Sequence, residues 1–132
     1  MPFYPGPGLG GHCIPLDPFY ISWKAAEFGE WAHFIELAGE INTRMPSYVV
    51  SRVAQALNQD GKAIHGSRLL VLGLSYKANI DDDRESPSYQ IIELPLGAGG
   101  HVEYCDARGG QSLVRCKHAH LGARDQVRHP RA

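Results

Sequence analysis

The chain has 132 residues, of which 43% are hydrophobic and 20% are charged, which excludes a disordered or fibrous protein and suits one ordinary domain or two small ones. The formal net charge of −1 gives no general reason to expect binding to nucleic acid or to a membrane surface. No apolar run approaches the roughly 20 residues that span a bilayer, and the first residues do not resemble a secretory signal. Three cysteines, an odd number, do not indicate a disulfide framework, so we expect a protein of the reducing cytoplasm.

Charge is distributed unevenly along the chain. Residues 1–106 carry seven Lys/Arg and thirteen Asp/Glu, whereas residues 107–132 carry six Lys/Arg and one acid, Asp125. The second segment also lacks apolar periodicity, so we expect a divergent, disordered basic tail over 107–132. Binding of nucleic acid by this tail is the less favoured alternative.

The N-terminal part of the chain predicts a loop followed by a helix. Prolines and glycines crowd residues 2–18 and disfavour a regular element. Asp17 followed by Pro18 is typical of a helix start, because Asp caps the first turn and proline suits the first helical position. Apolar residues then recur at helical spacing until Gly29, which is expected to end this helix.

A second, longer helix is predicted from Trp31 to Leu57. Apolar residues recur there at spacings of three or four over about seven turns. Pro46 lies inside this pattern and predicts a kink. Because so small a chain cannot cover an apolar stripe of this length, we expect a homodimer that forms through the long helix.

The second half of the chain predicts a strand, a helix and a second strand. Residues 58–66 have the composition of a linker, and 68–74 form a short apolar run typical of a buried strand. Ser86–Pro87 indicates a helix start, the glycines within 97–100 end that helix, and 101–106 alternate as a strand does. This order predicts a βαβ unit with parallel strands, which is too small to be a complete sheet.

Gly6 to Gly11 satisfies the pattern G-x-G-x-x-G of dinucleotide-binding loops. That loop needs a strand before it and a helix directly after it, so that the helix N-terminus meets the pyrophosphate. Here Pro2 and Pro5 precede it and Pro15 follows, so we reject this interpretation. Successive glycines still let a ligand approach the backbone closely, which makes the segment a candidate binding loop. A standalone nucleotide-binding loop is a less favoured alternative.

Cys13 lies between this loop and the predicted helix start, where backbone N–H groups favour a reactive thiol. Asp17 follows four residues later and could act as a base on a water molecule beside the sulfur. The alternative is a buried structural cysteine beside an ordinary helix cap. The residues alone favour neither interpretation.

The segment FYPGPGLGGHCIPLDPFYISWKA resembles the active-site segment of the UDP-glucose/GDP-mannose dehydrogenase family. With its continuation FIELAGEINTRMP, it is most similar to the branch that oxidises UDP-N-acetylhexosamines, that is, UDP-N-acetylglucosamine or UDP-N-acetylmannosamine. RLLVLGLSYKANIDDDRESP resembles the opening of the family's UDP-binding domain. The resemblance runs from Phe3 to Asp106 and ends near Ala107, and a truncated or shifted reading frame would explain both this break and the change in charge.

The resemblance implies an α/β protein with four parts. Residues 1–60 would hold the active-site loop and an all-α dimerisation region with a long kinked helix, and 61–66 would be a linker. Residues 67–106 would form the first βαβ unit of a truncated, Rossmann-like UDP-binding domain, followed by the tail at 107–132. The family's N-terminal NAD-binding domain has no counterpart here, so we expect this chain alone to be inactive.

The resemblance also implies a reaction, the NAD-dependent oxidation of the C6 alcohol of a UDP-sugar to a carboxylate in two steps, for surface polysaccharide precursors. Cys13 would trap the intermediate aldehyde as a thiohemiacetal that becomes a thioester, and Asp17 would help to activate the water that hydrolyses it. The competing hypothesis is a helical dimerisation or binding module without chemistry of its own. No metal site is expected.

The resemblance implies two groups of binding residues, which include the cations Lys77 and Arg84. For these two side chains, the alternative is a solvated loop charge paired with a neighbouring aspartate. The substrate contacts would be Phe3, Tyr4, Gly8, Gly10, Gly11 and Lys77, and the contact to the cofactor phosphates would be Arg84.

Overall fold

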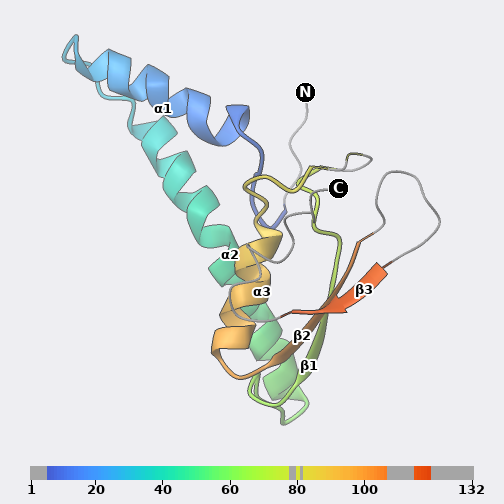
Figure 1. The fold of residues 1–132 in the computed structure, drawn as a ribbon. Coiled ribbons are helices and arrows are strands. Elements are labelled where there is room, and N and C mark those ends of the chain that lie inside the picture. The colour runs from blue at the N-terminus through green and yellow to red at the C-terminus, as the bar shows by residue number, and fades with distance from the viewer. Residues whose placement is uncertain (1–5, 78–79, 81, 107–114, 120–132) are drawn as a thin grey trace.

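A computed structural model describes residues 6–77, 80, 82–106 and 115–119 of the chain (Figure 1). It combines a long helical hairpin with a small sheet that one short helix covers, so the fold is α/β. Its elements are α1 (Cys13–Ala26), α2 (His33–Gln59), β1 (Arg68–Leu72), α3 (Ser88–Gly97), β2 (His101–Asp106) and β3 (Arg115–His118). Within the described segments, none of the helices combines the length and apolarity that crossing a bilayer requires.

Helix α1 begins at Cys13, so the predictions of a loop through residue 18 and of a helix start at Asp17 are wrong. The prolines misled the prediction. The first N–H groups of a helix have no partner within it, so Pro15 in the first turn removes no hydrogen bond, and Pro18 removes one at most. The predicted end is confirmed, because Gly29 closes the turn after α1 with a positive φ of 77°.

Helix α2 has 27 residues and matches the predicted long helix to within two residues at each end. It continues through Pro46, whose side chain is buried, and the kink there stays a prediction. Two contacts hold α1 against α2. The buried Ser22 hydroxyl donates to Glu36 Oε1 at 2.8 Å. The Phe19 ring lies so close to Gly39 that a Cβ there would be 2.2 Å from its Cζ.

The three strands form one sheet in the order β1-β2-β3. Strands β1 and β2 are parallel, in register from Arg68 opposite His101 to Leu72 opposite Cys105, with α3 as the connection, so the predicted parallel pair is confirmed. Strand β3 pairs antiparallel with β2. The prediction of a disordered tail is therefore wrong for 115–118, because composition averaged over the whole tail hid a strand of four residues. The other residues of that tail, apart from Ala119, lie outside the described residues.

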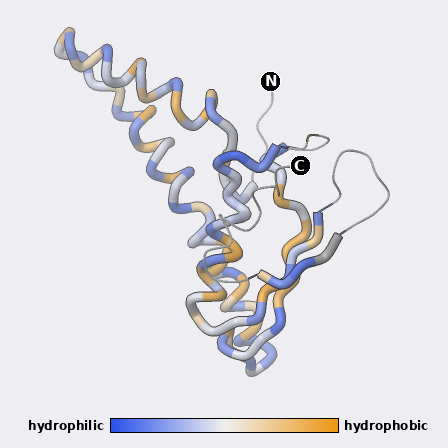
Figure 2. The backbone as a smooth tube through the Cα atoms, viewed as in Figure 1, coloured by the Kyte–Doolittle hydropathy of each residue, from blue (hydrophilic) through white to orange (hydrophobic). Residues whose placement is uncertain are grey.

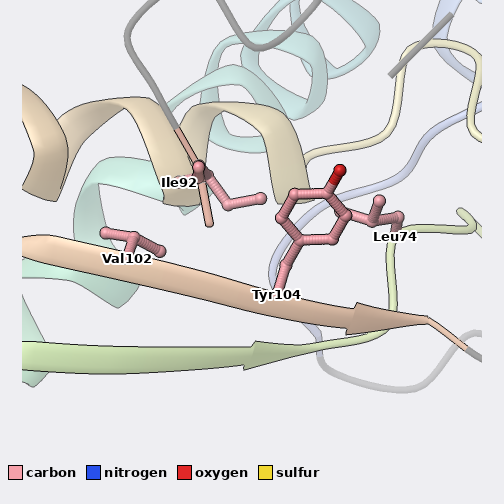
Figure 3. Packing of buried hydrophobic residues seen from close by; sticks show 5 residues of the cluster. Leu74, Ile92, Val102 and Tyr104 are labelled. Atoms are coloured by element: carbon pink, nitrogen blue, oxygen red, sulfur yellow. The ribbon is translucent and has the colours of Figure 1, made fainter. Parts of the chain in front are cut away.

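The hydrophobic core lies between α3 and the sheet. Figure 3 shows the Tyr104 ring of β2 between Ile92 of α3 and Leu74, with Val102 nearer the start of the strand. All four side chains are buried, and Ile92 is the most enclosed at 1% exposure. Burial of these side chains supplies the apolar driving force for this half of the chain.

The helical hairpin, in contrast, exposes large apolar side chains. Figure 2 shows that apolar residues recur along both helices out to the tip of the hairpin, away from the core. Phe34 is 88% exposed, Tyr20 70% and Trp23 65%. An apolar surface of this kind is typical of an interface, although the predicted homodimer itself stays a prediction.

The cysteines differ in their environments. Cys13 is free and exposed at the start of α1. Cys105 is buried on β2, and it takes part in a disulfide. The cysteine count argued against a disulfide framework, and it gave no indication of this single disulfide.

We expect Ile92→Ala to lower the free energy of unfolding by about 2–5 kcal/mol, because it removes buried methylene groups and leaves a cavity. Leu94→Ala is the matched control on the same helix, since Leu94 is 41% exposed, and it should cost clearly less. Urea unfolding followed by circular dichroism measures both variants. Equal losses would contradict the position of the core.

Candidate functional site

A cavity of about 720 Å³ lies where the two halves of the chain meet. Its wall is formed by residues from five places, namely a glycine segment (residues 8–12, without Gly10), the first turns of α1, the middle of α2, an acidic loop (residues 82–87, without Asp82) and the start of α3. The volume lies within the roughly 300–1,000 Å³ of pockets that bind small molecules and cofactors. The cavity is therefore the candidate binding site.

The side-chain amide of Asn42 on α2 holds the glycine segment at Leu9. The Leu9 backbone N–H donates to Asn42 Oδ1 at 2.6 Å, and Asn42 Nδ2 donates to the Leu9 carbonyl at 3.3 Å. The amide thus pairs with both backbone groups of one residue, because it offers a donor and an acceptor side by side. Sequence reasoning missed Asn42. The available signal was an asparagine in mid-helix, a position that this residue type disfavours.

The glycine segment also packs closely against the acidic loop. The Gly11 N–H donates to the Arg84 carbonyl at 3.0 Å. A Cβ on Gly10 would be 2.5 Å from Tyr76 Cβ and 2.9 Å from the Glu85 carbonyl oxygen, distances that no side chain tolerates. Gly10 is therefore required for packing within the protein. Gly8 and Gly11 line the cavity and Gly10 does not, so the expected role of Gly10 in lining the sugar lacks support from the cavity.

Cys13 and Asp17 both lie in the first part of α1 and are exposed. A separation of four residues within a helix places two side chains on the same face, one turn apart. Neither belongs to the cavity wall, but His12, Pro15 and Leu16 of the same segment do. The predicted nucleophile and the predicted base thus lie one turn apart on α1, and other residues of the same segment line the cavity.

Arg84 lines the cavity and forms an ion pair with Asp82. Its Nε donates to Asp82 Oδ1 at 2.8 Å and its Nη2 to Oδ2 at 2.5 Å, while its backbone N–H donates to Oδ1 at 3.1 Å. These hydrogen bonds lower the pKa of Asp82 to about 2. Pairing of Arg84 with an aspartate, which the sequence left open, is therefore present. Lys77 is exposed and does not belong to the cavity wall.

Asp83, which follows Asp82, has a different partner from its neighbour. The Tyr89 hydroxyl donates to Asp83 Oδ2, and both residues line the cavity. Burial raises the pKa of Tyr89 above its usual range, and the hydrogen bond to Asp83 raises it further. Sequence reasoning missed both roles, because Tyr89 was read only as an apolar residue of the helix.

The acidic loop turns sharply after Arg84. Glu85 adopts a positive φ of 51°, a left-handed conformation that costs roughly 1–2 kcal/mol for a residue with a Cβ. Its carbonyl oxygen lies against Gly10, and the Ser86 N–H donates to the Asp83 carbonyl at 3.1 Å. Strain of this kind persists where surrounding contacts fix the backbone, as they do here.

Not every predicted site residue can be placed. Phe3 and Tyr4 lie outside the described residues. In the part of the chain that the structure describes, no group of three or more side chains has the composition of a metal site.

Two domain types of one family match this sequence. The central domain of the UDP-glucose/GDP-mannose dehydrogenase family matches residues 1–44, and the UDP-binding domain of the same family matches residues 70–122. The chain belongs to this family. The second match continues to residue 122, so the expected break in the resemblance near Ala107 is wrong.

Relatives and solved structures agree with this assignment. UDP-N-acetyl-D-mannosamine dehydrogenase of Methanococcus maripaludis is 42% identical over 102 residues, which are 77% of this chain and 22% of that protein. NDP-N-acetyl-D-galactosaminuronic acid dehydrogenase of Ralstonia nicotianae is 45% identical over 89 residues, 67% of this chain and 19% of that protein. The UDP-D-ManNAc dehydrogenase structure from Pyrococcus horikoshii has a TM-score of 0.72 at 32% identity, covering 84% of this chain and 26% of that one. The chain thus spans about a quarter or less of the length of these dehydrogenases.

We expect Gly10→Ala to destabilise the chain by about 1–3 kcal/mol, because the added methyl group meets a Cβ and a backbone carbonyl rather than a mobile side-chain tip. Gly97→Ala in α3 is the matched control, since a Cβ there meets nothing within 4 Å. Urea unfolding gives the stabilities, and hydrogen exchange of the Gly11 amide reports on the docked segment. A Gly10→Ala variant with unchanged exchange at Gly11 would contradict this packing.

Proposed function

We propose that this chain carries the cysteine segment of a UDP-N-acetylhexosamine 6-dehydrogenase. The enzyme would oxidise the C6 alcohol of the sugar to a carboxylate in two steps with NAD, as part of surface polysaccharide precursor synthesis. The observation that carries this proposal is the free, exposed Cys13 on the first turn of α1, with Asp17 one turn later and with His12, Pro15 and Leu16 of the same segment in the cavity wall. The family and the names of the relatives support the same class of substrate.

NAD, when bound, would accept the hydrides of both oxidation steps. Arg84 suits contact with its phosphates, because a guanidinium binds phosphate oxygens in a planar, bidentate geometry and because Arg84 lines the cavity. Lys77, Gly8 and Gly11 would contact the UDP-sugar, together with Phe3 and Tyr4. Gly10 would support the binding of the UDP-sugar indirectly, because its close packing holds the neighbouring glycines in place.

Cys13 and Asp17 would perform the covalent steps. The Cys13 sulfur adds to the aldehyde carbon at C6, a C–S bond forms, and the carbonyl oxygen takes a proton to give a thiohemiacetal. Oxidation of this adduct leaves a thioester. Water then attacks the thioester carbon while the Asp17 carboxylate takes its proton, the C–S bond breaks, and Cys13 leaves as a thiolate. We place this reaction in the reducing cytoplasm, which would keep the exposed Cys13 thiol available and would require the buried Cys105 disulfide to resist reduction.

We further propose that the chain forms a homodimer through the α1–α2 hairpin. Large apolar side chains on this hairpin are exposed, and the core that α3 and the sheet form lies away from the tip of the hairpin, beside the second half of α2 (Figure 1). A second copy of the same hairpin would cover this surface, because an isologous interface joins identical patches. In this proposal, residues 1–60 form the active-site and dimerisation region and 67–106 open a Rossmann-like UDP-binding domain.

We expect iodoacetamide to alkylate Cys13 readily and to leave Cys105 unmodified unless the protein is first unfolded and reduced, since Cys13 is free and exposed whereas Cys105 is buried and takes part in a disulfide. Bound UDP-N-acetylglucosamine or UDP-N-acetylmannosamine should slow the reaction of Cys13. Mass spectrometry of the alkylated peptides measures both effects, with Cys13→Ser as the control. If neither UDP-sugar protects Cys13 at millimolar concentration, the non-catalytic module is favoured instead.

We expect the wild-type chain to sediment as a dimer and Phe34→Glu to shift it towards the monomer. A charge placed at a position that is 88% exposed in one chain costs little in the monomer but is costly in an apolar interface. Gln55→Glu is the matched control, since it adds the same charge at an exposed polar position of the same helix. Analytical ultracentrifugation decides the point, and a monomeric wild-type chain would exclude the proposed dimer.

A further inference from the structure

Asp82 lies beside the cavity without belonging to its wall, and its carboxylate faces Arg84. Three groups of Arg84 donate to it, namely the backbone N–H, Nε and Nη2. Nε lies 2.8 Å from Oδ1 and 3.1 Å from Oδ2, so the carboxylate approaches one edge of the guanidinium. This contact fixes both the backbone at Arg84 and the plane of its side-chain group.

An arginine side chain with this exposure is usually mobile. The Arg84 side chain is 65% exposed, whereas that of Asp82 is 21% exposed. A ligand that binds a mobile arginine must first order it, and this entropy loss reduces affinity. Because Asp82 already holds the guanidinium, much of the ordering is complete before a ligand arrives.

The ion pair leaves part of the guanidinium available. A guanidinium has five N–H donors, and the edge that Asp82 occupies uses Nε–H and one N–H of Nη2, so three donors remain. Among the described residues that line the cavity, Arg84 is the one lysine or arginine, and Asp83 and Glu85 are acidic. The remaining donors of Arg84 are therefore the permanent positive charge that this described part of the wall offers to an anionic ligand.

We propose that Asp82 is a positioning residue that holds the Arg84 guanidinium with its remaining donors available to a diphosphate group in the cavity. The proposal rests on the proposed function, in which Arg84 contacts phosphates. It makes a prediction opposite to that of simple electrostatics. Removal of a nearby negative charge would by itself strengthen the binding of an anion, whereas loss of a positioning residue weakens it.

The test is a titration of the full chain with inorganic diphosphate, followed by NMR at the Arg84 Nε–Hε resonance and by calorimetry. We expect Asp82→Asn to raise the Kd roughly three- to tenfold, because the guanidinium becomes mobile. Asp82→Glu should restore part of the affinity, since its carboxylate can still reach Arg84. Asp60→Asn is the matched control, as it removes the same charge at an exposed site where the partner, Lys62 Nζ, is 3.9 Å away.

Each outcome separates this proposal from the proposed function. If Asp82→Asn binds diphosphate as tightly as the wild type, or more tightly, the positioning role is wrong, while Arg84 can still be the phosphate contact. If Arg84→Ala binds diphosphate like the wild type, the phosphate contact is wrong, and the positioning role is wrong with it.

A second measurement applies even if Asp82→Asn does not fold. In the wild type, the Asp82 carboxyl should titrate with a pKa of about 2, and in Arg84→Ala the pKa should rise towards the ordinary value of 3.8. An unchanged pKa would show that Arg84 does not hold Asp82, which overturns the proposal.

Discussion

The hydrogen bonds of one short glycine segment fix how the helical hairpin and the α/β half of this chain meet at the cavity. Asn42 of α2 binds both backbone groups of Leu9, and two residues later the Gly11 N–H binds the Arg84 carbonyl. Cys13, two residues after Gly11, is the first residue of α1. The position of the thiol relative to Arg84 therefore depends on backbone contacts that neither side chain makes itself. A change at Asn42 or Gly10 would reach the candidate site through this segment.

How much of this arrangement the sequence predicts depends on the range of the interactions. Helix α2 and the parallel strands β1 and β2 were predictable, because apolar spacing is a local signal that the core then enforces. The start of α1 was not, since proline is a weak argument against the first turn of a helix. The pair formed by Asn42 and Leu9 joins residues 33 apart, and no pattern within a single sequence indicates such a contact.

The candidate site, too, was predictable only where its features depend on local sequence. The spacing of four between Cys13 and Asp17 was visible in the sequence, but it places both side chains on one face only because α1 begins at Cys13. The glycines were expected to admit a ligand, whereas Gly10 is required by the close approach of Tyr76 and Glu85. The sequence indicated which residues carry the chemistry, and it did not indicate which residues hold them in place.

Carboxylates near the cavity would repel an anionic ligand, and the contacts of the acidic loop reduce this repulsion. Asp82 forms an ion pair with Arg84, and Asp83 accepts a hydrogen bond from the Tyr89 hydroxyl. Two consecutive carboxylates therefore have separate partners within the protein. The left-handed Glu85 turns the chain immediately afterwards, while the Arg84 carbonyl faces Gly11 and the Arg84 side chain faces Asp82. Arg84 is therefore fixed at its backbone and at its side chain by different neighbours. Two of the three acidic residues of this loop therefore have partners within the protein, and Arg84 is the one lysine or arginine among the described residues of the cavity wall.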